Sequence, residues 1–148
     1  MNRAKSSIWV VAPELGIPES PALLVESGNL WLAYFQALNE SLAIVRFSGL
    51  IDHRLMPIGD EGLGGHPYVL AGLQPYSFNE LIGSEETVSR PYSGARHWVV
   101  TFKDETLDVI ARTGEVIASG LALASPLEAL LTFNSHKLQT AFSTTDAC

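Results

Sequence analysis

The chain has little cysteine and little charge. Its 148 residues include one cysteine, Cys148, and Asp, Glu, Lys and Arg together make up 17%. A single cysteine excludes an intrachain disulfide and fits a reducing compartment, so we expect a cytoplasmic protein. The charged fraction is below the quarter or so that is usual in soluble domains. This shortage predicts that a partner covers part of the apolar surface.

Basic residues are the scarcer of the two signs of charge. There are 9 Lys and Arg against 16 Asp and Glu, which gives a formal net charge of -7. The basic residues are scattered along the chain, and a negative field repels phosphate groups. We therefore expect neither nucleic acid nor an anionic membrane as a partner. The same field suits a basic protein partner or a cation.

Long hydrophobic runs are also missing. The run of residues 8–12 is too short for a signal-peptide core, and no window reaches the eighteen or so apolar residues of a membrane span. Hydrophobic residues still make up 47% of the chain, which is enough for a core. We expect one domain over residues 1–148, with residues 1–7 and 143–148 frayed at its ends.

The spacings that identify common catalytic sites do not occur. The sequence contains no His-x-x-x-His, Cys-x-x-Cys, Gly-x-Ser-x-Gly or P-loop motif. On these grounds the sequence favours a non-enzymatic protein over an enzyme, and it predicts no cofactor.

What the chain does contain is a series of short apolar segments separated by turns. Alternation and β-branched or aromatic content predict strands over residues 8–12, 23–26, 30–36, 42–48, 97–102 and 106–111, with a short one at 115–118. The connections are too short for parallel crossovers, so the segments from 23 to 48 predict an antiparallel meander. Residues 84–96, which contain Pro91 and Gly94, predict a flexible loop.

Two helices are predicted from capping signals. Ser77 and Glu80 have the spacing of a capping box, which predicts a short helix to about Ile82. Ser125 before Pro126 predicts the start of a C-terminal helix. That helix is predicted to pack on the sheet through leucines at positions 127, 130, 131 and 138. The fold class is thus α+β: a mainly antiparallel curved sheet, as a small barrel or sandwich, with a short middle helix and a C-terminal helix.

The segment from Gly59 to Tyr68 gathers chemically active side chains in a glycine-rich loop. Asp60, Glu61 and His66 lie within it, and they are the candidate catalytic residues. Together with His53 and His97, His66 is also a candidate metal ligand. The other interpretation is that the two carboxylates are solvated or bond to the turn backbone while His66 packs beside Pro67.

Aromatic side chains form the remaining candidate site. Trp31, Tyr34, Tyr68 and Trp98 offer surface for a binding pocket or an interface, and core packing is the alternative use.

The loop and the following hairpin also resemble a pattern found in small bacterial proteins without an established function. In that pattern a Gly-x-x-Asp-Glu type loop leads to His-Pro, and a His, an apolar strand, Phe-x-Asp and a second strand follow. The matching residues are Asp60, Glu61, His66, Pro67, Gly72, Leu73, His97, Phe102, Asp104 and Ala111. The match is partial: the pattern has Asn before the Asp-Glu pair and His before the later Asp, whereas this chain has Gly59 and Lys103 at those positions. The resemblance implies that the loop and the hairpin belong together.

These observations lead to one main expectation about function. We expect a small bacterial interaction or accessory protein, of the partner-binding or immunity-like kind, that binds a protein partner or self-associates as a homo-oligomer. Two alternatives remain. One is a small metal-dependent hydrolase using His66, Asp60 and Glu61, and the other is an aromatic-lined small-molecule binding module.

Overall fold

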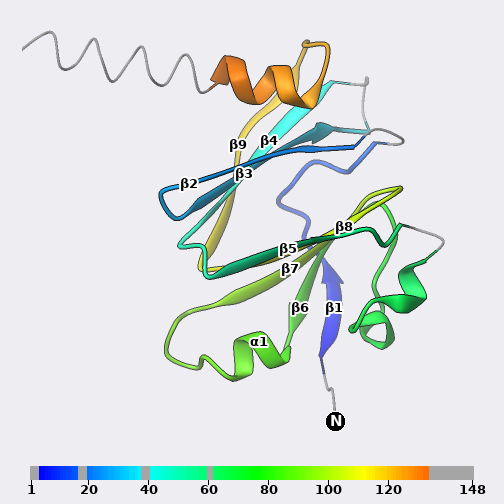
Figure 1. The fold of residues 1–148 in the computed structure, drawn as a ribbon, viewed down its shortest axis with the longest axis vertical. Helices are drawn as coiled ribbons and strands as arrows, with labels where there is room; N and C mark the ends of the chain where they lie inside the picture. Colours follow the sequence, from blue (N-terminus) through cyan, green and yellow to red (C-terminus); the bar gives the residue numbers. More distant parts are fainter. Residues whose placement is uncertain (1–3, 17–19, 38–40, 60–61, 134–148) are drawn as a thin grey trace, which may run out of the picture.

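A computed structural model shows two antiparallel β-sheets that face each other as a sandwich (Figure 1). It describes residues 4–16, 20–37, 41–59 and 62–133. In these residues the sheets have five and four strands, and they do not close into a barrel. The predicted α+β class with a mainly antiparallel sheet is confirmed, in its sandwich form.

The strand order shows that each sheet combines distant parts of the chain. The five-stranded sheet has the order β1 (Lys5–Ile8), β6 (Phe78–Ile82), β7 (Arg96–Thr101), β8 (Thr106–Ala111) and β5 (Asp52–Met56). The four-stranded sheet has the order β2 (Ala22–Glu26), β3 (Asn29–Phe35), β4 (Leu42–Ser48) and β9 (Thr113–Leu121). The predicted meander (β2, β3 and β4) and the predicted hairpin (β7 and β8) are confirmed.

Side chains that alternate along the strands fill the space between the sheets. The hairpin contributes Trp98, Val100, Phe102, Leu107, Val109 and Ala111, as its period of two predicts. The ring of Trp9 lies among them, with its centroid 5.4 Å from Trp98 and 5.8 Å from Phe78. Burial of this aromatic and aliphatic core is the main stabilising contribution to the sandwich.

Each sheet is also covered on its outer face. Residues 126–133 are helical and lie over the four-stranded sheet, where Leu130 packs near Trp31 and Ile44 (Figure 1). The outer face of the five-stranded sheet is covered by two short 3-10 turns, η1 (Leu63–Gly65) and η2 (Val69–Ala71), and by α1 (Glu85–Val88). The candidate site lies under this second cover.

The helix start at Ser125 is confirmed, and its hydroxyl accepts a hydrogen bond from the Glu128 N–H at 3.2 Å. The predicted packing face is partly wrong. Leu130 is buried, but Leu127 and Leu131 are 59% and 60% exposed, and the small Ala129 is buried instead. Position 138 lies outside the described residues.

The short helix predicted from Ser77 to Ile82 is wrong, because this segment forms β6. Pairing with β1 and β7 outweighs the local capping signal. The Ser77 hydroxyl donates to the carbonyl of Pro75 instead, and the Glu80 carboxylate accepts two hydrogen bonds from Arg96 at 2.8 and 3.0 Å. The short middle helix is α1, inside the stretch of residues 84–96 that was predicted to be a loop.

Other strands differ from the prediction at the edges of the sheets. The first strand was predicted over residues 8–12, but β1 ends at Ile8 because the chain then crosses to the other sheet, and Trp9 turns into the core. Residues 5–7, which the sequence assigns to a frayed end, lie in β1. β5 was missed because it is an exposed edge strand with few apolar residues. β9 is longer than predicted, and it pairs with β4 in the four-stranded sheet.

Candidate functional site

Two imidazoles share one carboxylate on the outer face of the five-stranded sheet. His66 Nε2 lies 2.8 Å from Asp108 Oδ1, and His97 Nε2 lies 3.0 Å from Asp108 Oδ2. The side chains of His66 and His97 are fully buried, and that of Asp108 is 11% exposed. These three side chains are referred to below as the histidine cluster.

Strand alternation and the glycine-rich loop bring the cluster together. In the β7–β8 pair Val99 lies opposite Asp108, so His97 and Asp108 project from the same outer face. The loop reaches this face through η1, where the His66 N–H donates to the Leu63 carbonyl at 3.0 Å. Leu63 and Val99 belong to the same apolar cluster, which holds the loop over the sheet.

The hydrogen bonds of His66 define its tautomer. Its Nδ1 accepts the backbone N–H of Tyr68 at 3.0 Å, and an atom that accepts a hydrogen bond carries no proton of its own. The proton must therefore sit on Nε2, from which it is donated to Asp108. His66 is held as a neutral imidazole between a backbone donor and a carboxylate acceptor.

His97 connects the cluster to α1. Its Nδ1 lies 2.9 Å from the hydroxyl of Ser84 and 3.5 Å from Glu86 Oε2. Tyr68 packs against the same imidazole, with the two rings at 90° and their centroids 5.5 Å apart. The Tyr68 hydroxyl donates to the Glu86 carboxylate and accepts the Glu85 N–H at 3.0 Å.

These contacts shift the pKa values of two groups. Burial raises the pKa of the Tyr68 hydroxyl, and its hydrogen bond to Glu86 adds to this effect, so the pKa reaches about 12. Burial by itself would also raise the pKa of Asp108. The hydrogen bonds from His66 and then His97 outweigh burial and leave the pKa of Asp108 below its usual value. Asp108 therefore stays ionised inside the fold.

The chemistry open to the cluster is limited by how completely its atoms are used. Ser84, His97 and Asp108 are connected in the order of a hydrolase triad, but the Ser84 and His97 side chains are buried, whereas a nucleophile must reach its substrate. Across the described parts of the chain, no group of three or more His, Cys, Asp or Glu side chains is arranged to hold a metal ion. The cluster ties the loop and α1 to the sheet.

The other residues predicted for catalysis or metal binding do not join the cluster. Asp60 and Glu61 lie outside the described residues. His53 is exposed on β5 and lies opposite Val109. Its side chain and that of Asp108 therefore project from opposite faces of the sheet. The structure thus brings His66 and His97 together and leaves His53 apart.

The four predicted aromatic residues lie in three different surroundings. Trp98 is in the core between the sheets, and so is Tyr34, whose hydroxyl donates to the Pro13 carbonyl at 2.7 Å. Burial raises the pKa of Tyr34. Trp31 lies under the C-terminal helix with Arg46 over its ring at 5.2 Å, and Tyr68 packs in the histidine cluster. None of the four is on an open surface, because their exposed fractions are 5% or less.

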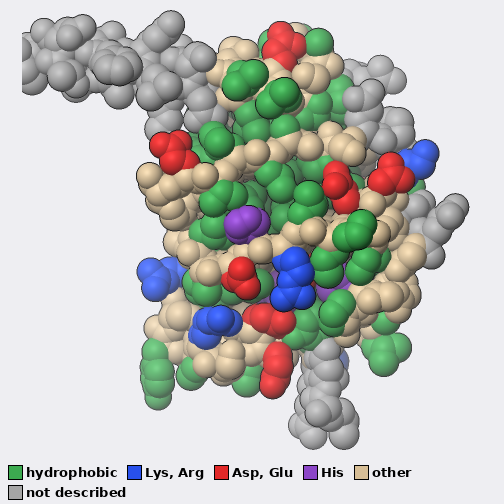
Figure 2. All heavy atoms as spheres, viewed as in Figure 1, with side chains coloured by type: hydrophobic (Ala, Val, Ile, Leu, Met, Phe, Trp, Pro, Cys, Tyr) green, Lys and Arg blue, Asp and Glu red, His purple; other side chains and the backbone are tan. Residues whose placement is uncertain are grey.

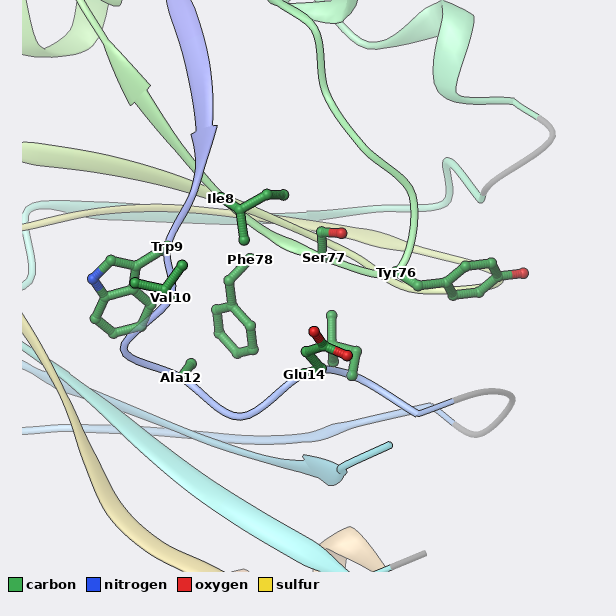
Figure 3. Close-up of a pocket in the computed structure, with 9 residues that line it drawn as sticks. Ile8, Trp9, Val10, Ala12, Glu14, Tyr76, Ser77 and Phe78 are labelled. Carbon is green, nitrogen blue, oxygen red and sulfur yellow. The ribbon is translucent and has the colours of Figure 1, made fainter. Parts of the chain in front are cut away.

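A second candidate site lies where the chain crosses between the sheets after β1. A hollow of about 350 Å³ opens there, and Figure 3 shows its lining side chains. They come from two segments, and they are Ile8, Trp9, Val10, Ala12, Glu14 and Leu15 from the first and Tyr76, Ser77 and Phe78 from the second. Sequence reasoning missed this site. The only local signal was Pro13, which ends the apolar run that was interpreted as a strand.

Comparison with known protein families, with characterised proteins and with solved structures finds no match to this chain. The contact of His66 with Asp108 joins the loop to the hairpin, but membership of the bacterial group that the sequence resembles stays a prediction. In the described residues no helix is long and apolar enough to cross a membrane.

Proposed function

We propose that this chain is a non-enzymatic protein-binding protein, of the bacterial accessory or immunity-like kind, acting in the cytoplasm. The observation that carries the proposal is the hollow beside β1. Val10 and Ile8 line it and are 85% and 47% exposed, although both are aliphatic. An open apolar lining next to a buried aromatic core is typical of a surface that a partner covers.

The surroundings of the hollow support this interpretation. Val11 is 57% exposed, and β1 is an edge strand of its sheet, so its outer side is open to another chain. Figure 2 shows hydrophobic side chains lying open between scattered charged ones on the face viewed. The low charge content of the sequence is consistent with a surface of this kind.

The histidine cluster supports a binding function over a hydrolytic one. Both nitrogens of each imidazole and both oxygens of Asp108 have partners inside the protein. A general base needs a free position within reach of the substrate proton, and a metal site needs free donor atoms. Such a closed arrangement is better suited to holding the fold than to chemistry.

A photo-crosslinking experiment tests the proposal. A photoreactive amino acid replaces Val10 in one variant and Leu70 in a matched control, since Leu70 is an aliphatic residue that is 99% exposed and does not line the hollow. We expect a specific adduct from position 10 only. The adduct partner, once purified, should bind the wild-type protein and lose affinity for Val10→Asp. Equal labelling from both positions would contradict the proposal.

Sedimentation equilibrium at micromolar concentration then identifies the kind of partner. A homodimer that Val10→Asp dissociates would make a second copy of this chain the partner, as the predicted homo-oligomer requires. A monomer would assign the surface to a different protein.

The volume of the hollow favours a second candidate function. About 350 Å³ is at the lower end of the range for small-molecule sites. A small ligand that binds only the folded state would raise the melting temperature, and Val10→Asp would remove that shift.

A further inference from the structure

Glu14 places an unpaired carboxylate at the hollow. The chain is fixed around it, because the Glu14 carbonyl accepts the Ala37 N–H at 2.8 Å and Leu15 bridges to Gln36. Leu15 is buried, so the neighbouring Glu14 side chain is directed to the open side. Its carboxylate makes no hydrogen bond or ion pair within the part of the chain that the structure describes, and Figure 3 shows it across from Ser77.

The opposite wall of the hollow is equally well fixed. The Thr101 hydroxyl donates to the Gln74 carbonyl at 2.7 Å and accepts the Ser77 N–H at 2.9 Å. The buried Asn79 side chain adds hydrogen bonds to the backbone of Gln74 at 2.9 and 3.1 Å. These bonds hold the turn before β6 in one conformation, so little ordering is needed when a ligand binds.

Tyr76, within this turn, has a strained backbone. Its φ is +52°, and a bulky residue in the left-handed region is a genuine outlier that the surrounding structure must hold in place. Strain of this kind is concentrated at binding sites. The Tyr76 ring, which ends in a polar hydroxyl, lines the hollow. Tyrosine is enriched at protein interfaces.

The remaining lining is apolar. Ile8, Val10 and Phe78 line the hollow, and Figure 3 shows their side chains. A ligand that matches both parts needs an aliphatic stem for these side chains and a cation for the carboxylate. Arginine has this construction, and its planar guanidinium forms bidentate hydrogen bonds with a carboxylate.

We propose that the hollow binds an arginine side chain of a protein partner, with the stem against Ile8, Val10 and Phe78 and the guanidinium on Glu14. This inference rests on the proposed protein-binding function and specifies the chemistry of the partner. The net charge of -7 supports it, since a negative field accelerates encounter with a basic surface.

The test compares two peptides and two variants of the full chain. The first probe is the acetylated, amidated peptide Ala-Val-Arg-Val-Ala, and the second carries citrulline, the uncharged isostere, in place of arginine. Binding is measured from NMR shifts of the Trp9 indole and of the Ser77 and Phe78 amides. The variants are Glu14→Gln and a matched control, Glu26→Gln, at an exposed glutamate on β2 away from the hollow.

We expect the arginine peptide to shift these signals. Its affinity should be about tenfold higher than that of the citrulline peptide and about tenfold higher than its own affinity for Glu14→Gln, while Glu26→Gln binds as the wild type does. Equal affinity for both peptides, unchanged binding by Glu14→Gln, or no shift at millimolar peptide would overturn the inference. So would butylguanidinium binding as tightly as the peptide, because the ligand would then be a small cation.

Failure here is distinguishable from failure of the protein-binding function. If the partner crosslinked at Val10 loses affinity for Val10→Asp but not for Glu14→Gln, the protein-binding function stands and the arginine assignment is wrong. If position 10 yields no specific adduct, the function itself is contradicted.

Discussion

Asp108 is the residue on which the outer cover of the five-stranded sheet depends. Its two oxygens accept hydrogen bonds from His66 and His97, which belong to the loop and to β7. Removing the carboxylate leaves two buried donors without an acceptor. Each such group costs about 1–3 kcal/mol when it is left unsatisfied.

We therefore expect Asp108→Ala to lower the free energy of unfolding by about 2–6 kcal/mol, the sum over two unsatisfied donors. Asp108→Asn should cost less. His97 can move its proton to Nδ1, next to Ser84 and Glu86, and accept the new amide N–H at Nε2. His66 cannot do so, since its Nδ1 accepts the Tyr68 N–H, and it would keep the amide oxygen. Urea denaturation measures both variants. Equal losses would contradict this account of the tautomers.

The same carboxyl predicts how stability depends on pH. The pKa of Asp108 is lower in the folded protein than in the unfolded chain, so its stabilising contribution is complete above the unfolded pKa, about 4. The contribution is lost as the pH falls through that value toward the folded pKa. The difference in unfolding free energy between the wild type and Asp108→Asn should therefore shrink below about pH 4. A difference that stays constant down to pH 3 or so would contradict the lowered pKa.

At the residue scale, the sequence predicted two of the three residues of the histidine cluster as site residues, but it did not predict how they are arranged. His66 and His97 were candidates, but Asp108 was not connected with them, because 42 and 11 residues separate it from the two histidines along the chain. Contacts of this range depend on strand register, and register is not visible in a local pattern. Glu14 and Tyr76 were missed for the same reason, since their proximity follows from the crossing between sheets.

At the scale of elements, the β2–β3 hairpin shows how a turn fixes its strands. Glu26 pairs with Asn29, so Ser27 and Gly28 form a two-residue loop, and both have positive φ, +50° and +77°. This is the type I′ geometry, for which Asn-Gly is favoured. Ser27 is thus a less suitable residue than asparagine at its position.

We expect Ser27→Asn to raise the free energy of unfolding by about 0.5–1 kcal/mol, because asparagine tolerates the left-handed conformation better than serine. Thermal or urea denaturation measures the change. Ser20→Asn is the matched control, since Ser20 is exposed and lies outside this turn. A gain of the same size in the control, or none at Ser27, would contradict the turn assignment.

Strands with a strong hydrophobic periodicity were predicted well, whereas edge strands, which lack this periodicity, were predicted poorly. β3, β4, β7 and β8 have a dense alternation that packing between sheets requires, and their positions were found to within a residue or two. β5 has no such alternation, because neither of its faces is buried. β6 was predicted as a helix because a capping spacing is a local signal and its pairing with β1 is not.

At the scale of the whole molecule, two candidate sites with different proposed roles lie in different places. The histidine cluster is on the covered outer face of the five-stranded sheet, and the hollow lies where residues 8–15 cross toward the other sheet. Each can therefore be changed separately. Variants far apart with no shared contacts have nearly independent effects.

The most direct measurement is the affinity of the partner crosslinked at position 10 for three proteins: wild type, Val10→Asp and Asp108→Asn. The account predicts a loss of about tenfold or more for Val10→Asp and no change for folded Asp108→Asn, because the hollow binds and the cluster supports the fold. If folded Asp108→Asn lost the partner while Val10→Asp kept it, the binding site would be at the histidine cluster, and the central claim would be wrong.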